Sequence, residues 1–254
     1  MPTIFDVLTD AGVDWVYFEN DIGFLRMYDR YRLDSRHVLP FGDFARRAAL
    51  GLLPPVTFID PNFVDIPPSA TANDDHAPAD LRLGQRLVGA IHDILVASPD
   101  WITGDGGTLL VVTYDEHGGF FDHVAPPGTQ RSERPDPVPL IHPEGETFYG
   151  PRVPTFAIGP FVRPGSVDHT VYDHTSIIAT ILRRFVGEFP AELGSRPALA
   201  NHLGHALTLD EPRRPSAVGS VTIPRAIRGL REVRPDPDAF HAAMRALARP
   251  RRRA

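Results

Sequence analysis

The feature that most constrains the fold is an apolar run, Thr108-Leu-Leu-Val-Val-Thr-Tyr114, which lacks the alternation of a half-exposed strand. Such a run is typical of a central strand that is covered on both faces. The other predicted elements alternate along the chain, with strands over 13–18, 56–60 and 153–158 and helices over 3–10, 80–98 and 175–186. This alternation predicts an α/β fold with a mostly parallel sheet.

The alternating pattern ends near residue 205. Residues 1–204 are therefore expected to form one domain. Proline and arginine dominate after that point, and 205–254 is interpreted as a tail or small appendage with a short helix over 239–248. A solvated, frayed terminus is the expected state of its basic end.

Composition excludes several classes of function. The net charge of −6 provides no basic face for nucleic acid. Cysteine is absent, so a metal would be held by carboxylate, imidazole, amide or hydroxyl groups. No segment approaches the roughly 20 apolar residues of a membrane span. The first residues lack the pattern of a signal peptide, so the chain as written is expected to stay in the cytoplasm.

A dense cluster of ionisable residues follows the apolar strand. Asp115 and Glu116 come directly after it, at the carboxyl end where α/β sheets place their ligands. His117 adds an imidazole, and after a Gly-Gly turn Asp122 and His123 supply a second acid–imidazole pair. A solvated acidic loop is the alternative interpretation. Two adjacent carboxylates repel each other unless a cation lies between them or solvent screens them. Five ionisable groups next to a buried strand therefore favour a binding site over a surface loop.

Another polar segment, Asn73-Asp-Asp-His76, precedes the predicted helix over 80–98. A turn with a helix cap explains this segment equally well when it is taken alone. In an α/β fold, however, the loop opens on the same edge of the sheet as Asp115. The two clusters are therefore expected to converge.

A third segment lies at the start of the predicted helix over 175–186. Asp173 is expected to cap this helix. His174 would then lie at its N-terminus, where the positive potential favours a neutral, ligating imidazole. A structural histidine is the alternative. Together the three segments provide oxygen and imidazole groups without sulfur, which suits Ca, Mg, Mn or Zn in phosphate-ester chemistry.

The order of these segments resembles a bacterial phosphoesterase family that includes non-haemolytic phospholipases C and related acid phosphatases. The resemblance covers about residues 3–187, and its most specific parts are Tyr114-Asp-Glu-His-Gly-Gly-Phe-Phe-Asp-His123 and Gly150-Pro-Arg-Val-Pro154. It implies a three-layer α/β/α fold of the alkaline phosphatase superfamily, incomplete on the N-terminal side. It also implies hydrolysis of phosphate mono- or diesters, phospholipids among them, through a metal-bound hydroxyl nucleophile.

The same resemblance assigns roles to individual residues. Carboxylates after the strand would bind the divalent metal, and imidazoles would contact the phosphate, protonate the leaving group or line the pocket. The residues matched in this way are Asp115 and Glu116 as metal ligands, His76, His123 and His174 as catalytic residues, and Asp75 and His117 as substrate-binding residues.

The sequence departs from the family before its first helix. Members carry there a Glu-Asn metal motif near a Ser-Phe-Asp-His signature, followed by a Ser or Thr nucleophile. Neither is recognisable here, and Glu19-Asn20 is interpreted as a coincidence because the signature does not follow it. Members are often exported, so the localisation of the whole protein stays open.

Three interpretations of this departure are open. The chain is an inactive metal- or phosphate-binding module from a truncated or mis-started gene, or it pairs with a separately encoded N-terminal half. Otherwise another hydroxyl supplies the nucleophile, such as that of Ser69 or Thr71.

Overall fold

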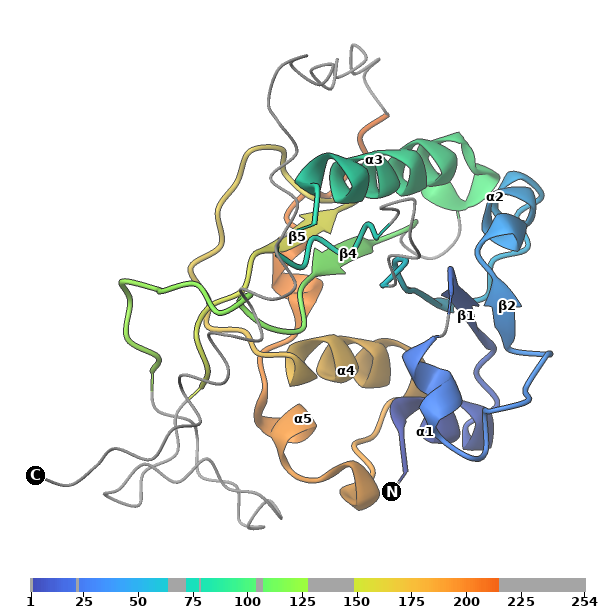
Figure 1. The fold of residues 1–254 in the computed structure, drawn as a ribbon, viewed down its shortest axis with the longest axis horizontal. Coiled ribbons are helices and arrows are strands. Elements are labelled where there is room, and N and C mark those ends of the chain that lie inside the picture. Colours follow the sequence, from blue (N-terminus) through green and yellow to red (C-terminus); the bar gives the residue numbers. More distant parts are fainter. Residues whose placement is uncertain are drawn as a thin grey trace, which may run out of the picture.

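The computed structural model describes residues 2–21, 23–63, 72–77, 79–103, 107–127 and 149–214. The helices are α1 (Ile4–Asp10), α2 (Gly42–Ala49), α3 (Leu81–Ala97), α4 (Thr175–Ile181) and α5 (Arg196–Leu199) (Figure 1). The strands are β1 (Trp15–Glu19), β2 (Val38–Pro40), β3 (Val56–Ile59), β4 (Leu110–Thr113) and β5 (Thr155–Ile158). One turn of π-helix continues α4 over Leu182–Val186, and short 3-10 turns occupy Phe24–Met27, Pro99–Trp101, Ala191–Leu193 and Leu203–Ala206.

Some predictions fall outside the described residues. These are the helix over 239–248 and the alternative nucleophiles Ser69 and Thr71. The packed part of the chain continues past the predicted boundary at 204, because the amide of Leu209 donates to the carbonyl of Phe161 at 3.1 Å. Within the described part of the chain, no helix has the length and apolar character needed to cross a bilayer.

Helix α1, predicted over residues 3–10, begins at a reciprocal cap. The Thr3 hydroxyl accepts a hydrogen bond from the Asp6 amide, and the Asp6 carboxylate accepts one from the Thr3 amide. Gly12 follows the helix with a φ of 68°, in the left-handed region that glycine adopts without strain. The cap therefore sets the start of the helix, and its apolar residues face the core.

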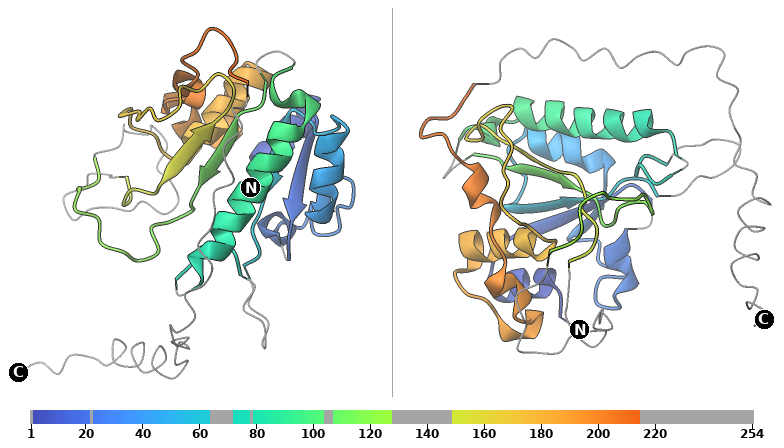
Figure 2. Two further views of the ribbon diagram at one scale, coloured as in Figure 1. Left: turned by 90° about the horizontal axis from the view of Figure 1, so that it is seen from above. Right: turned by 90° about the vertical axis from the view of Figure 1, so that its left-hand side faces the viewer.

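The first sheet is parallel, with the strand order β2-β1-β3. Trp15 of β1 pairs with Val56 of β3, and Tyr17 pairs with Val38 of β2. Helices α2 and α3 lie on one side of the strands, and α1 and α4 lie on the other (Figure 2). The predicted α/β fold with a mostly parallel sheet is confirmed.

Strand β4 differs from its prediction. It pairs with β5 in the antiparallel direction, with Leu110 opposite Ile158 and Thr113 opposite Thr155. Its residues are half-buried. The prediction of a central strand covered on both faces is therefore wrong for the described residues. An apolar run indicates that a strand can be buried, but it does not specify which strands pair with it or in which direction.

Strand β1 connects the two halves of the hydrophobic core. Trp15 and Tyr17 contact the cluster that includes residues of α1 and α4. Val16 and Phe18 point to the opposite face, into the cluster formed with α2 and α3. All four side chains are at most 4% exposed. Because full burial of such a side chain contributes about 1.5–3 kcal/mol, β1 anchors helices on both sides.

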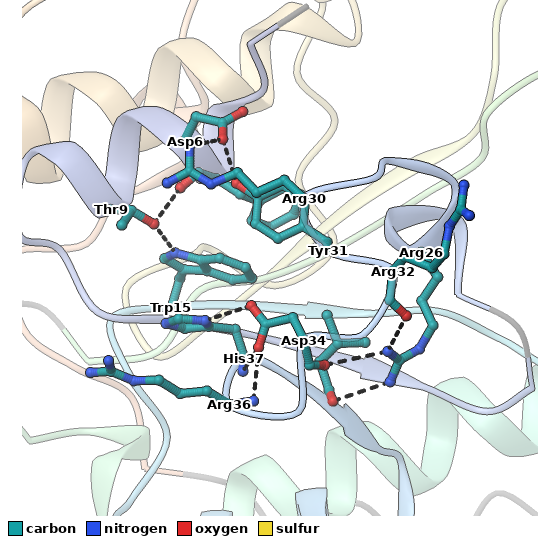
Figure 3. Close-up of polar contacts among 12 residues, drawn as sticks. Asp6, Thr9, Trp15, Arg26, Arg30, Tyr31, Arg32, Asp34, Arg36 and His37 are labelled. Atoms are coloured by element: carbon teal, nitrogen blue, oxygen red, sulfur yellow. Dashed lines mark hydrogen bonds and ion pairs between the residues drawn. The ribbon is translucent and has the colours of Figure 1, made fainter.

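A polar network fixes the segment between β1 and β2. The Trp15 indole stacks on the His37 imidazole, with 4.4 Å between the ring centroids, and His37 Nδ1 lies 2.9 Å from Asp34 Oδ2 (Figure 3). Nearby, the Arg26 guanidinium donates to both oxygens of Glu19, with Nη2 at 2.7 Å from Oε1. Glu19 therefore has a structural partner at the end of β1.

The cap of α1 can be tested with Thr3→Ala. The Asp6 amide loses the hydroxyl oxygen that it shares with the Thr3 carbonyl as acceptor, so the free energy of unfolding should fall by about 1 kcal/mol, measured by urea denaturation. The control is Ser166→Ala, which removes an exposed loop hydroxyl and should change stability by less than about 0.5 kcal/mol. Equal denaturation midpoints for the two variants would contradict the capping role.

Candidate functional site

The candidate site begins where β4 ends. Tyr114, Asp115 and Glu116 leave the strand in that order, and the turn closes on itself through two hydrogen bonds. The Glu116 amide donates to Asp115 Oδ1 at 3.0 Å, and the Gly118 amide donates to Glu116 Oε2 at 2.7 Å. Gly118 and Gly119 have φ values of 69° and 76°, which explains why the turn contains two glycines.

The loop before α3 reaches this turn, as the sequence predicts. His76 Nδ1 lies 3.7 Å from Glu116 Oε1, and His117 Nδ1 lies 3.5 Å from Glu116 Oε2. The Glu116 carboxylate therefore lies between two imidazoles. Its side chain is 46% exposed and that of His76 is 68% exposed, so both are open to solvent. The roles assigned to these residues stay predictions.

His174 approaches from the start of α4. Its Nε2 lies 2.9 Å from the main-chain carbonyl of Tyr114. The predicted cap beside it is present, because the Asp173 carboxylate accepts the Ser176 amide at 3.1 Å and the Thr175 hydroxyl at 2.6 Å. The capped helix start thus brings a second distant imidazole to the exit of β4.

Asp75 lies beneath this surface. Its Oδ2 accepts a hydrogen bond of 2.9 Å from the Tyr114 hydroxyl. Burial and this hydrogen bond raise the pKa of Tyr114, so the phenol stays protonated at neutral pH. The other oxygen of Asp75 packs against α3, where a Cβ on Gly84 would collide with it. The side chain predicted to bind substrate therefore contacts two protein elements.

The second acid–imidazole pair is held by a different contact. The Asp122 carboxylate pairs with Arg152 of the Gly-Pro-Arg-Val-Pro segment, with Arg152 Nε at 2.8 Å from Oδ2. Asp122 and His117 line one shallow surface depression together with Phe120 and Phe121. His123 is not among the residues that line it. Its Nδ1 lies 3.8 Å from Asp122 Oδ1, and its side chain is 83% exposed.

The two predicted metal ligands, Asp115 and Glu116, are joined by no third ligand in the described part of the chain. Among the described residues, no three His, Asp or Glu side chains lie close enough together to hold a metal ion. Asp115 and Glu116 offer two carboxylates on one turn, whereas protein sites for Zn use about four ligands and those for Ca about six to eight. These residues alone therefore do not form a complete ligand set for a divalent cation.

Sequence reasoning missed Tyr114, Gly84 and Arg152. A glycine inside an otherwise regular amphipathic helix is a signal of close approach that could have identified Gly84. The tyrosine carried no such signal, because an aromatic residue at the end of an apolar strand is ordinary. The dipeptide interpreted as a coincidence makes structural contacts, since Asn20 Nδ2 donates to the Asp60 carbonyl at 2.7 Å and Glu19 binds Arg26.

Known proteins share these segments. A family model described as the Phosphoesterase family matches residues 1–186, which confirms the resemblance. "Non-specific phospholipase C6" of Arabidopsis thaliana is 36% identical over 204 residues, which are 72% of this chain and 36% of that protein. "Non-specific phospholipase C3" of the same plant is 33% identical over 240 residues, covering 88% of this chain and 44% of that protein.

A bacterial relative shows the same relationship. "Non-hemolytic phospholipase C" of Pseudomonas aeruginosa is 34% identical over 146 residues, which are 51% of this chain and 20% of that protein. The chain therefore spans less than half the length of each of these three relatives.

The packing of Asp75 on α3 can be tested with two glycines of that helix. A Cβ on Gly89 meets nothing within 4 Å, so Gly89→Ala should raise the free energy of unfolding by about 0.5–1 kcal/mol. Gly84→Ala should instead lower it by about 1–3 kcal/mol, because its Cβ collides with the Asp75 carboxylate. Chemical denaturation measures both. Equal stabilisation by the two substitutions would show that Asp75 does not pack there.

The contact between Asp122 and Arg152 can be tested by titration. Hydrogen bonds from the Arg152 guanidinium, and then from the Val124 amide, hold the pKa of Asp122 well below its usual range. The folded carboxylate therefore adds stability above the unfolded pKa of about 3.9, and loses it as the pH falls through the lower folded value. Arg152→Gln should raise the pKa of Asp122, measured by carboxyl carbon NMR. Arg163→Gln is the control, and an identical titration in both variants would contradict the contact.

Proposed function

Because the chain belongs to the phosphoesterase family, we propose that it acts in the hydrolysis of phosphate esters and that the turn after β4 handles the phosphate. The observation that carries this proposal is the approach of His76 Nδ1 to within 3.7 Å of Glu116 Oε1. The two residues come from segments far apart in the sequence, both inside the matched range. Phosphate-ester cleavage requires groups that hold phosphoryl oxygens and a group that protonates the leaving alkoxide.

The imidazoles suit the proton transfer. Histidine titrates near neutral pH, so it can give a proton to the departing alkoxide and later recover it. His76 is exposed enough for a substrate to reach, and it lies beside the Glu116 carboxylate. His174 would act as a second imidazole. If its Nε2 donates to the Tyr114 carbonyl, its Nδ1 is left as an acceptor. His123 is retained as a third candidate, on the same turn.

A divalent cation is also part of the proposal. Asp115 and Glu116 would supply carboxylate oxygens, which are ligands that Ca, Mg, Mn and Zn all accept. No third side chain joins this pair among the described residues, so the remaining ligands would come from other parts of the protein. Cation binding by this pair is testable separately from hydrolysis.

The proposed substrate is a phospholipid. The relatives described above are phospholipases C by name. In this chain, His117 and Arg152 lie beside the exposed rings of Phe120 and Phe121 in one surface depression. Charged groups next to apolar rings suit an ester with a phosphate head and an apolar tail. His117 would then contact the head group, as the family resemblance implies.

The proposal includes the complete fold. We infer a three-layer α/β/α architecture of the alkaline phosphatase superfamily. Its support is the parallel sheet β2-β1-β3, with helices on both sides of the strands. A half-buried β4 is consistent with further contacts in a longer protein.

A second candidate function is favoured by the coverage of the relatives. The chain spans 36% and 44% of the two plant proteins, so it would be one half of a split hydrolase or a module that binds metal and phosphate without turnover. In either case the purified chain would bind these ligands and release no product.

The experiment measures release of p-nitrophenol from its phosphate and phosphorylcholine esters by the full chain, with Ca, Mg, Mn or Zn added in turn. Hydrolysis should fall at least about 100-fold in Asp115→Asn/Glu116→Gln. Asp29→Asn/Glu192→Gln removes the same charge from distant exposed positions and should leave the rate unchanged.

Each outcome separates the candidates. Unchanged hydrolysis in Asp115→Asn/Glu116→Gln would refute the assignment of the site. Calorimetric binding of a cation or inorganic phosphate without turnover would favour the second candidate, and turnover by the pure chain would exclude it.

A further inference from the structure

We propose that Tyr114 is a positioning residue for the candidate site. It ties the loop that carries His76 and the helix start that carries His174 to the turn that carries Asp115 and Glu116. The inference rests on the proposed function for its catalytic consequence. Its structural part rests on contacts alone and is tested without activity.

Tyr114 contacts both distant segments at once. Its hydroxyl donates to Asp75 Oδ2 at 2.9 Å, and its main-chain carbonyl lies 2.9 Å from His174 Nε2. The same residue is covalently joined to Asp115. Three segments that supply candidate site residues therefore meet at one side chain and its peptide group.

Asp75 is held in a conformation that fits this contact. Its φ is 63°, in the left-handed region, and it is the one residue other than glycine with a positive φ among the described residues. Its Oδ1 is buried, with no hydrogen-bond partner in the part of the chain that the structure describes. That oxygen faces α3 at Gly84, where any Cβ would occupy its place. The hydrogen bond from the Tyr114 hydroxyl thus holds Asp75 in an uncommon backbone conformation, although its other carboxylate oxygen is unpaired among the described residues.

The side chain of His76 makes no hydrogen bond among the described residues. Its side chain is 68% exposed, and its distance of 3.7 Å from Glu116 is longer than a hydrogen bond. Its amide donates to the neighbouring Asp74 carboxylate at 3.3 Å, and its carbonyl accepts a hydrogen bond of 2.8 Å from the Ala79 amide. The position of this imidazole therefore depends on the backbone of the loop, which the hydrogen bond between Tyr114 and Asp75 ties to the end of β4.

Asp75 consequently affects the position of the loop that carries His76 and does not contact the substrate. The sequence predicts that its carboxylate contacts the substrate, yet the carboxylate is turned toward Tyr114 and α3. We assign it the acceptor of the positioning bond. A misplacement of about 1 Å in a catalytic group lowers a rate up to about 100-fold, so this bond would affect turnover without touching the substrate.

The first test needs no activity. Amide hydrogen exchange is followed by NMR at Asn73, His76 and Ala79, whose amides are hydrogen-bonded within or next to the loop. Tyr114→Phe and Asp75→Gly should each raise these exchange rates about tenfold, because the loop opens more often. Glycine adopts a φ of 63° freely, so Asp75→Gly removes the carboxylate without adding strain. Asp75→Asn keeps an acceptor and should restore slow exchange.

The matched control is Tyr31→Phe. Tyr31 also donates its phenolic hydrogen to an aspartate, Asp6, at 2.7 Å, but it does so beside α1. Removing the Tyr31 hydroxyl should leave the exchange rates of the three loop amides unchanged. Unchanged exchange at these amides in both Tyr114→Phe and Asp75→Gly would overturn the proposal. If Tyr114→Phe fails to fold, Asp75→Gly and its Asp75→Asn rescue decide the question.

The second test uses the p-nitrophenyl esters. Tyr114→Phe should lower kcat about 10- to 100-fold with KM within about threefold of the unchanged chain, because the imidazole is displaced and the substrate contacts remain. Equal kcat values would refute the catalytic consequence. Faster loop exchange in a chain without hydrolysis would uphold the positioning role and reject the proposed turnover, so the two failures are distinguishable.

Discussion

The burial of β1 on both faces is the constraint on which the rest of the structure depends. Trp15 and Tyr17 require apolar cover on one side, and Val16 and Phe18 require it on the other. Helices must therefore flank the strand on both sides, and the loops at its carboxyl edge become the exposed part of the sheet. Because residues of the buried strands supply the packing of the core, the loop residues at this edge can be polar and can form a binding site.

Much of this architecture follows from local sequence. The cap at Thr3, the amphipathic stripe of α3 and the cap at Asp173 are each encoded within a few residues, so their elements were predictable. The strands that pair with β4 were not predictable from local sequence. Its antiparallel partner lies 42 residues away at Thr155, and the pairing depends on chain direction, which an apolar run of four or five residues does not encode.

The candidate site divides in the same way. Asp115, Glu116 and His76 could be proposed because carboxylates and imidazoles that gather at strand ends add little to packing and commonly serve a site. Tyr114 could not be proposed, because its importance is geometric, and Gly84 could be identified only as a point of close approach. The role of Tyr114 depends on the carboxylate of Asp75, which is distant in the sequence and accepts its hydrogen bond. The role of Gly84 depends on the same carboxylate, which packs where a Cβ would lie. Sequence thus identifies reactive groups more readily than the residues that hold them in place.

The separation of contacts along the chain has a kinetic consequence. In the parallel sheet, β1 pairs with β2 across 21 residues, from Tyr17 to Val38, and with β3 across 41 residues, from Trp15 to Val56. The contacts at Tyr114 span 39 residues to Asp75 and 60 residues to His174. Closing longer loops loses more chain entropy before any contact compensates for it. The contact of Tyr114 with His174 spans the longest of these segments, so the complete site should assemble after the parallel sheet and be among the first regions to open in the native protein.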